Sequence, residues 1–296
     1  MAVHLSPESH CIKDNLEPYL FNHEGCLISA SDLKNTLRHM KADECDVLYI
    51  HSSMKFGMPN LQLGRSGLLE ALADVLYSLG VSTLIMPSYT FSFCNEEVFD
   101  REKSASSMGA LNEYLRVRHQ WIRSCDPLMS NILHGEERGL LTQIGKQSVG
   151  EDSTFDLLSS SNLKVKFLFL GPRVHDCFTY MHYLEALRRT PYRYDFTFTG
   201  SIIDGEKRFQ DSYTLFIRDK GVQAGAGAKI YENILIERAL AGYERLGAAS
   251  ITVVDLEPAR DLYLELLTMS PNFYIEEVFR QPERSTEFTA RKMVAL

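Results

Sequence analysis

The chain has 296 residues, which is enough to bury a large core, and its 45% hydrophobic and 24% charged residues are ordinary values for a globular protein. Its net charge of −8 argues against nucleic acid or an anionic membrane as the main partner, and it suits a polycationic ligand. No uninterrupted apolar segment is long enough to span a bilayer and the first residues do not resemble a signal peptide, so we expect a cytoplasmic protein.

The N-terminal region is expected to begin without regular structure. Residues 1–30 show weak periodicity and are predicted to form an irregular lead-in. Residues 31–40 then predict a short helix whose cap is Ser31 or Asp32, because such side chains accept hydrogen bonds from the first free backbone N–H groups of a helix.

A strand over residues 46–50 is predicted next, followed by a glycine-rich loop and a helix over residues 68–79 with an apolar stripe. The carboxyl end of such a strand is where α/β sheets bind ligands, and the backbone N–H groups at a helix start suit a phosphate. The polar and glycine residues at these two places are His51, Ser52, Ser53, Gly64 and Ser66.

Strands and helices continue to alternate up to residue 189. A second strand is predicted over residues 83–87, and helices are predicted over residues 108–117 and 154–158. This alternation is typical of right-handed βαβ units. We therefore predict an α/β fold with a mostly parallel central sheet flanked by helices.

One segment combines a buried strand with a cluster of reactive side chains. The strand is predicted over residues 165–170, and on the helix after it Thr179, His182 and Glu185 lie one turn apart, opposite the apolar stripe. His182 is thus a candidate general base, since imidazole titrates near neutral pH. Glu185 is a candidate for fixing the imidazole tautomer, with another carboxylate as the alternative. The alternative for His182 is a surface histidine on an amphipathic helix.

Beyond residue 189 the pattern changes. Alternating residues predict an antiparallel hairpin around Asp204 and Gly205, since Asp-Gly is a strong turn signal. The elements predicted in this region are strands over 196–203, 213–218 and 251–254 and helices over 229–245 and 259–268. Because no linker is visible, we expect a single domain over residues 1–296, with residues 190–296 as a C-terminal antiparallel elaboration.

Five motifs occur in an order that resembles the aminoglycoside 3-N-acetyltransferase family (antibiotic N-acetyltransferases). They are the His51-Ser52-Ser53 strand end, the glycine-rich turn, the Met86-Pro87 strand end, the Arg123-Ser124-Cys125-Asp126-Pro127-Leu128-Met129-Ser130 loop and the Thr179-x-x-His182-x-x-Glu185 helix. The resemblance extends from about Val47 to Arg193.

The resemblance implies an N-acetyltransferase that moves the acetyl group of acetyl-CoA directly to an amine, with His182 as the general base. Thr179 is then a candidate donor to the thioester oxygen or the leaving sulfur, and the alternative is a hydroxyl that bonds its own helix backbone. Arg123 is a candidate ligand contact, and its alternative is an ion pair. The residues expected to bind acetyl-CoA are His51, Ser52, Ser53, Gly64, Ser66, Arg123, Ser124 and Ser130.

One departure from the family pattern bears on the acceptor. Asp126 stands where aminoglycoside-modifying members usually have histidine, and Tyr192 and Arg193 follow the candidate catalytic helix. This combination resembles the branch that acetylates nucleotide-linked amino sugars for surface polysaccharides. We therefore expect a small amino-sugar acceptor, a nucleotide-linked 3-amino-dideoxy sugar first, with Asp126, Tyr192 and Arg193 as its binding residues.

Two alternatives stay open on the sequence. One is an aminoglycoside acceptor, which the negative charge favours. The other is a non-catalytic coenzyme A-binding protein, against which the joint presence of Thr179 and His182 argues. The six cysteines are scattered without metal-ligand spacing, so we expect neither a disulfide nor a metal site. A monomer or a homodimer is expected.

Overall fold

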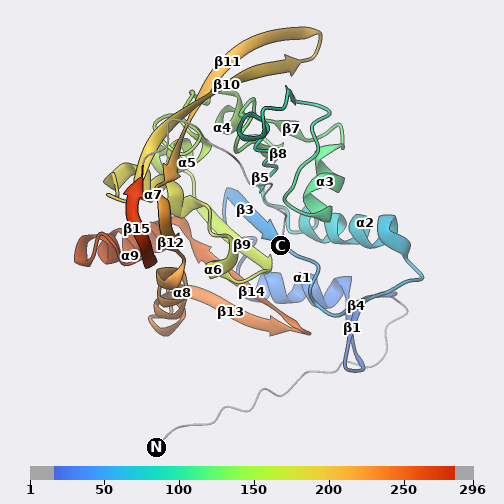
Figure 1. The fold of residues 1–296 in the computed structure, drawn as a ribbon. Coiled ribbons are helices and arrows are strands. Elements are labelled where there is room, and N and C mark those ends of the chain that lie inside the picture. The colour runs from blue at the N-terminus through green and yellow to red at the C-terminus, as the bar shows by residue number, and fades with distance from the viewer. Residues whose placement is uncertain (1–16, 284–296) are drawn as a thin grey trace, which may run out of the picture.

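The computed structural model describes residues 17–283, and its centre is a seven-stranded sheet with helices on both sides (Figure 1). Three strands that the sequence predicted, β3, β5 and β9, form the middle of this sheet. Across the sheet the order is β13 (Ala241–Leu246), β14 (Ala249–Asp255), β9 (Val165–Gly171), β3 (Val47–Ser52), β5 (Thr83–Pro87), β8 (Asn131–Gly135) and β7 (Ile122–Arg123).

The strand directions correct the expectation of a mostly parallel sheet. β3 lies parallel to β5 and β9, but β13, β14, β8 and β7 each run antiparallel to their neighbours, so the sheet is mixed. β13 and β14 are joined by a short turn, which allows antiparallel pairing, whereas parallel neighbours need a long crossover. The sequence pattern missed these edges because β7, β8 and β13 were not predicted as strands.

Both faces of the central strands are buried, because alternate residues of a strand point to opposite sides of the sheet. Leu48 and Ile50 of β3 belong to one hydrophobic cluster, and Val47 and Tyr49 belong to another. The first face is covered by α1 (Ala30–His39), α2 (Gly64–Tyr77) and α3 (Ala110–Arg116), and the second by α5 (Thr154–Ser160), α7 (Tyr180–Arg188), α8 (Ala226–Glu237) and α9 (Leu256–Met269).

The N-terminal region is regular over its described part. β1 (Tyr19–His23) and β2 (Cys26–Ser29) form a hairpin that β4 (Met58–Pro59) extends to a three-stranded sheet. The expected irregular lead-in is therefore wrong for residues 19–29, and residues 1–16 lie outside the described part. Ser29 caps α1, since its hydroxyl accepts from the Asp32 N–H at 3.1 Å, so neither Ser31 nor Asp32 is the cap.

The predicted C-terminal hairpin is confirmed and is longer than expected. β10 (Arg193–Asp204) and β11 (Lys207–Arg218) pair along their whole lengths, and their tip projects beyond the body in Figure 1. The remaining elements are β6 (Phe99–Asp100), which pairs with β10, and η1 (Phe93–Asn95), α4 (Gly139–Thr142), α6 (Val174–Cys177), β12 (Lys220–Ala224) and β15 (Ile275–Glu283). β12 and β15 pair antiparallel.

The helix predicted over residues 229–245 is wrong in its second half. α8 ends at Glu237, and Ala239 takes a left-handed φ of 53°, which ends a helix. Residues 241–246 instead form β13, because pairing with β14 satisfies their backbone groups at the edge of the main sheet.

We expect Gly135→Ala to destabilise the central sheet. Gly135 ends β8 opposite Thr83 with φ +129°, and a Cβ there would lie 2.1 Å from the carbonyl oxygen of Ser82. Backbone strain together with this clash should lower the free energy of unfolding by about 3–5 kcal/mol. Denaturant titration followed by circular dichroism measures the change.

The matched control is Gly205→Ala at the hairpin tip. Gly205 also has a positive φ, +61°, but open space surrounds the position of its missing Cβ. Its unfolding free energy should therefore fall by only about 1 kcal/mol. Equal losses in the two variants would contradict this account.

Candidate active site

The candidate catalytic helix α7 follows β9 through a short, fixed connection. β9 ends at Gly171, where φ is +100° and a Cβ would lie 2.6 Å from the carbonyl oxygen of Ser53, so only glycine lets the two strand ends approach. The connection is then pinned to α8. Arg173 Nε lies 2.5 Å from the carboxylate of the fully buried Glu232, and His175 contacts the same carboxylate. These contacts fix where α7 begins.

Three titratable side chains meet where α7 lies against the start of β10. His182 Nδ1 lies 3.4 Å from Glu185 Oε2 and 3.1 Å from Arg193 Nη2. Arg193 Nε lies 2.7 Å from the same Glu185 oxygen. The side chain of His182 is 28% exposed, whereas those of Glu185 and Arg193 are 0% and 9% exposed. His182 is therefore the member of this cluster that a substrate can reach.

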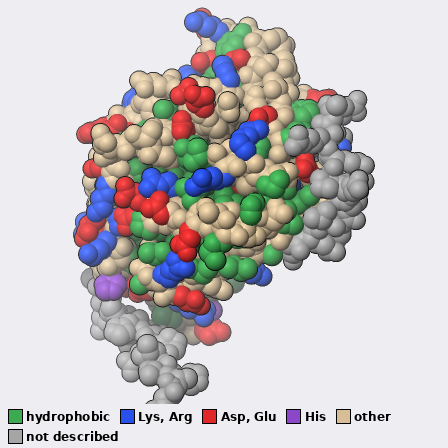
Figure 2. All heavy atoms as spheres, turned by 90° about the vertical axis from the view of Figure 1, so that its left-hand side faces the viewer, with side chains coloured by type: hydrophobic (Ala, Val, Ile, Leu, Met, Phe, Trp, Pro, Cys, Tyr) green, Lys and Arg blue, Asp and Glu red, His purple; other side chains and the backbone are tan. Residues whose placement is uncertain are grey.

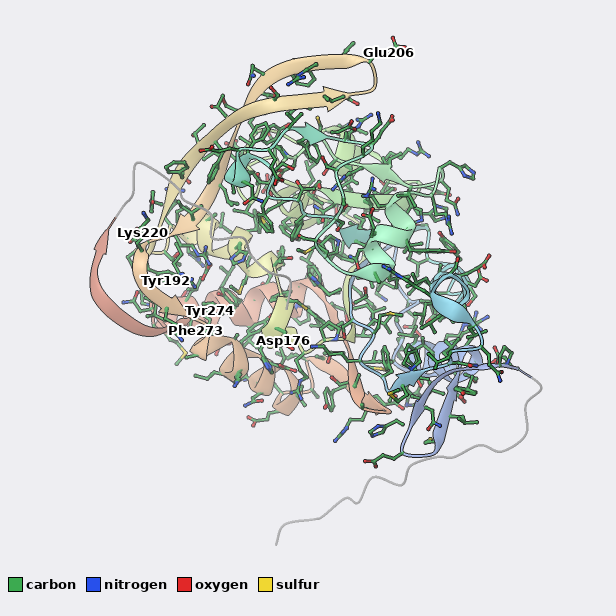
Figure 3. All side chains as sticks on the ribbon, turned by 45° about the vertical axis from the view of Figure 1, so that its right-hand side comes forward. Asp176, Tyr192, Glu206, Lys220, Phe273 and Tyr274 are labelled. Atoms are coloured by element: carbon green, nitrogen blue, oxygen red, sulfur yellow. The ribbon has the colours of Figure 1, made fainter. Side chains whose placement is uncertain are left out.

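Two tyrosines hold Glu185 from the core side. The Tyr192 hydroxyl donates to Glu185 Oε1, and the Tyr263 hydroxyl of α9 donates to the same oxygen at 3.2 Å. Tyr192 is buried, and in Figure 3 it lies far from Glu206 at the hairpin tip. Tyr192 and Arg193, which were expected to bind the acceptor, are thus both directed at Glu185.

The electrostatics of the cluster keep His182 neutral and Glu185 ionised. Burial lowers the pKa of His182, and the neighbouring Arg193 guanidinium lowers it further, against the opposing effect of Glu185. Burial alone would raise the pKa of Glu185, but Arg193 and His182 outweigh it, so the pKa of this carboxyl lies below its usual range. A neutral imidazole beside a fixed carboxylate is the form that a general base requires.

Thr179 adjoins a buried chain of polar groups that the sequence analysis missed. Its Oγ1 lies 3.0 Å from the Tyr89 hydroxyl, which in turn lies 3.0 Å from the Tyr49 hydroxyl. Tyr49 donates to Asn131 Oδ1 at 2.6 Å. Thr179 makes no capping hydrogen bond to its own helix, which removes that alternative. The only signal in the sequence was that Tyr89 follows the predicted strand over residues 83–87.

The polar residues at the end of β3 have distinct surroundings. His51 is buried and stacks on Phe169 with ring centroids 5.1 Å apart, and burial lowers its pKa to about 3, so its imidazole is neutral. Ser52 donates to Asn112 Oδ1 at 2.9 Å and so joins β3 to α3. The backbone N–H of Ser53 continues the ladder toward β9.

The loop between β7 and β8 turns its polar side chains inward. Arg123 is buried, donates to the Ser88 carbonyl at 2.6 Å and donates to Ser130 Oγ at 3.1 Å. Ser124 Oγ accepts from the Asn131 N–H, and Ser130 Oγ donates to the Ser88 carbonyl. Arg123, Ser124 and Ser130 were expected to contact acetyl-CoA, but here they tie this loop to the end of β5.

Asp126 also forms hydrogen bonds that stabilise this loop. Its Oδ1 accepts from the backbone N–H groups of Leu128 and Met129 at 2.8 and 3.0 Å and from the Ser148 hydroxyl at 3.0 Å. The side chain is buried, and burial raises the pKa of its carboxyl. The aspartate that replaces the usual histidine at this position therefore stabilises the conformation of the loop.

A cavity of about 350 Å³ lies between α2 and α3. Ser66 and Arg65 line it at the start of α2, just inside the helix that Gly64 begins, and α3 contributes Glu113. Asn112, the neighbour of Glu113, holds Ser52 at the end of β3, so the cavity is tied to the carboxyl end of that strand. Ser66 is therefore the one residue expected to bind acetyl-CoA that lines this cavity.

The structure thus has a histidine paired with a buried carboxylate on the helix that follows β9, and a cavity at the start of α2. A sequence model of the aminoglycoside 3-N-acetyltransferase family matches residues 49–268, so the chain belongs to that family. It is an N-acetyltransferase, and acetyl-CoA is its co-substrate.

Solved structures show the same fold at low sequence identity. The apoenzyme of aminoglycoside acetyltransferase AAC(3)-IVa is 19% identical, with a TM-score of 0.65 over 89% of this chain and 94% of that one. AAC-IIIb, solved as a binary complex with CoASH, is 16% identical, with a TM-score of 0.68 over 86% and 98%. YokD from Bacillus subtilis is 19% identical, with a TM-score of 0.63 over 80% and 98%. No curated protein sequence matches the chain.

Two further observations concern residues 17–283. Within this range no group of three or more His, Cys, Asp or Glu side chains is arranged to hold a metal ion. Within the same range no helix is both long and apolar enough to cross a membrane.

We expect opposite pH shifts from the two partners of His182. The base must be unprotonated, so kcat/KM for the acceptor should rise with pH through the pKa of His182, below the ordinary value of about 6.5. Arg193→Met removes a positive neighbour and should move this acid limb to higher pH. Glu185→Gln removes a negative neighbour and should move it to lower pH. The pH dependence of kcat/KM with one acceptor measures both shifts.

Arg189→Met serves as the control, because Arg189 is an exposed cation near the same turn that pairs with Asp195. The acceptor amine titrates identically in all four proteins, so differences between the profiles report on His182. Coincident acid limbs in the Arg193 and Glu185 variants would remove His182 from the role of base.

Proposed function

We propose that the chain acetylates a primary amine of a small cationic amino sugar by direct transfer from acetyl-CoA. The observation that carries this proposal is the cluster of His182, Glu185 and Arg193. His182 Nδ1 faces the buried Glu185–Arg193 pair, which leaves Nε2 as the ring nitrogen for the reacting amine. The nitrogen–carbon bond forms, the carbon–sulfur bond breaks, His182 takes the proton of the amine, and coenzyme A leaves as the thiolate.

An aminoglycoside is the acceptor that the observations favour. The net charge of −8 attracts polycations. Two enzymes of the same fold were solved with such molecules, AAC-VIa bound to sisomicin and a mutant of AAC(3)-IVa in complex with a gentamicin. On the face drawn in Figure 2, acidic and basic side chains are interspersed, so the described residues on that face form no continuous basic surface for a polyanion.

The sequence features that favoured a nucleotide-linked amino sugar as the acceptor have other roles in the structure. That interpretation relied on Tyr192 and Arg193 to stack on a base and bind phosphates, but both side chains are occupied by Glu185. It also relied on Asp126, whose Oδ1 is bonded within its own loop. The assay below therefore compares nucleotide-linked amino sugars with aminoglycosides as acceptors.

The cavity between α2 and α3 is the place we assign to part of acetyl-CoA. α2 has 14 residues and no side-chain cap, and the Gly64 N–H bonds the Leu61 carbonyl, so the N–H groups that follow Gly64 are the ones placed to bind a phosphate or amide oxygen. Arg65 adds a positive charge at the same place, and Ser66 adds a hydroxyl. Of the expected acetyl-CoA contacts, this assignment retains Ser66, which lines the cavity.

We expect His182→Ala to abolish acetyl transfer while acetyl-CoA still binds. A positioned general base contributes on the order of 10²–10⁴ in rate, so the loss should appear in kcat. A thiol-release assay with acetyl-CoA and a panel of aminoglycosides, free amino sugars and nucleotide-linked amino sugars measures it and ranks the acceptors. His119→Ala, which removes an exposed histidine, is the control.

The panel also decides between the acceptors. We expect release with aminoglycosides and little with nucleotide-linked sugars. The reverse ranking would restore the nucleotide-sugar interpretation, and near-normal turnover of His182→Ala would remove that residue from the mechanism.

We also expect no acetyl-enzyme intermediate. Cys177 is the thiol nearest in sequence to the cluster, but burial raises the pKa of its thiol, and its Sγ donates to the Arg173 carbonyl at 3.6 Å. Intact-mass measurement after mixing the enzyme with acetyl-CoA alone should show no added acetyl group. An adduct that an amine discharges would contradict direct transfer.

A further inference from the structure

The open end of the β10–β11 hairpin carries two arginines opposite each other. Arg193 begins β10 and Arg218 ends β11, and the two are partners in the register of the hairpin. The side chains of such a pair lie on the same face of the ribbon, with their Cβ atoms about 4.5–5.5 Å apart, and like charges there are destabilising. The fold therefore keeps an unfavourable contact next to the candidate base.

The two arginines differ in their partners. Arg193 is largely buried against Glu185 and His182, whereas Arg218 is exposed. Three carboxylates of the hairpin pair with other cations, Asp195 with Arg189, Asp204 with Arg101 and Asp211 with Lys146. Among residues 17–283 no carboxylate lies within ion-pair distance of Arg218, so its charge stays unpaired in this part of the chain.

The charge of Arg218 acts on the candidate base. Burial lowers the pKa of His182 most, Arg193 lowers it next and Arg218 adds to both, while Glu185 opposes them. Partial burial and repulsion from Arg193 also lower the pKa of Arg218 itself, against the effect of Glu185. A guanidinium does not lose its proton near neutral pH, so this repulsion persists under working conditions.

The phenols around these charges do not offset them. Tyr192 and Tyr274 both act on Arg218, but burial raises the pKa of Tyr274 to about 12 and that of Tyr192 further, so both keep their protons near neutral pH. Burial likewise raises the pKa of Tyr263, which donates to Glu185. The two arginines thus face one negative charge, that of Glu185. This local excess of positive charge is opposite in sign to the net charge of −8 of the whole chain.

We infer that Arg218 acts through its charge as a positioning residue: it leaves one positive charge beside His182 that Glu185 does not neutralise, so that the acceptor amine is held there in its neutral form. This inference rests on the proposed function. Primary amines are mostly protonated at neutral pH, and an ammonium has no lone pair with which to attack the thioester. A positive site disfavours the ammonium, whose extra proton goes to solvent before transfer. The same field keeps His182 neutral, so it can take a proton from the amine as the nitrogen–carbon bond forms.

The test is the pH dependence of kcat, which reports on the groups of the enzyme–substrate complex. It is measured with acetyl-CoA and the best acceptor of the panel. Arg218→Met removes the charge and should move the acid limb of kcat to higher pH by about half a unit to one unit. On that limb kcat should therefore fall about threefold to tenfold, and on the alkaline plateau it should stay within about twofold.

Two matched variants and one change of conditions serve as controls. Arg218→Lys keeps the charge and should keep the acid limb. Arg189→Met removes an exposed arginine that pairs with Asp195 and should also leave the limb in place. Salt at about 1 M screens exposed charges, so it should move the limb of the unaltered enzyme toward that of Arg218→Met and affect the variant less.

Thermal unfolding separates this role from a structural one. Because Arg218→Met relieves the contact between like charges, the unfolding temperature should rise by about 1–2 °C. A merely structural role of Arg218 predicts the opposite, a lower unfolding temperature with an unmoved acid limb. Arg218→Gln also removes the charge, and it carries the test if Arg218→Met fails to fold.

The outcomes are distinct. An acid limb of folded Arg218→Met that coincides with that of the unaltered enzyme would overturn the inference while the proposed function stands. A raised KM for the acceptor with an unmoved limb would also overturn it, since Arg218 would then be a binding contact. Absence of thiol release by the unaltered protein with every amine of the panel would overturn the proposed function and this inference together.

Discussion

A single buried carboxylate organises the candidate active site of this molecule. Glu185 has no exposed surface, and an ionised carboxylate is stable in such a place only when charges and donors surround it. Arg193, His182, Tyr192 and Tyr263 supply them from α7, from β10 with the turn before it, and from α9. The position of the histidine and the packing of three elements therefore depend on one ion pair and its hydrogen bonds.

This constraint changes how the charged residues of the family motifs are interpreted. Arg193 lies next to His182, and its guanidinium pairs with Glu185 and lowers the pKa of His182. Arg123 and Asp126 lie in a loop expected to bind ligands, yet both are buried and bonded to backbone groups. Charged residues in these motifs thus hold neighbouring side chains and loops in position.

Two features follow neighbouring strands of the central sheet. The α2–α3 cavity comes after β3, whose Ser52 donates to Asn112 of α3, and the candidate base His182 lies on α7 after β9. Thr179 accepts a hydrogen bond from Tyr89, and the chain continues through Tyr49 to Asn131, residues that come from the end of β5, from β3 and from β8. Its hydroxyl therefore depends on the register of three strands rather than on its own helix.

The sequence by itself determined the elements whose signals are local. The apolar runs of β3, β5 and β9 predicted buried strands, and helical periodicity alone placed Thr179, His182 and Glu185 along one face. Strand direction, the buried state of Arg193 and the hydroxyl chain were decided only by the tertiary structure. Glu185 bonds Tyr263, which is 78 residues away in the chain, and Thr179 bonds Tyr89, which is 90 residues away. Such distant neighbours help to set a side chain's burial and charge state, so no local pattern carries them.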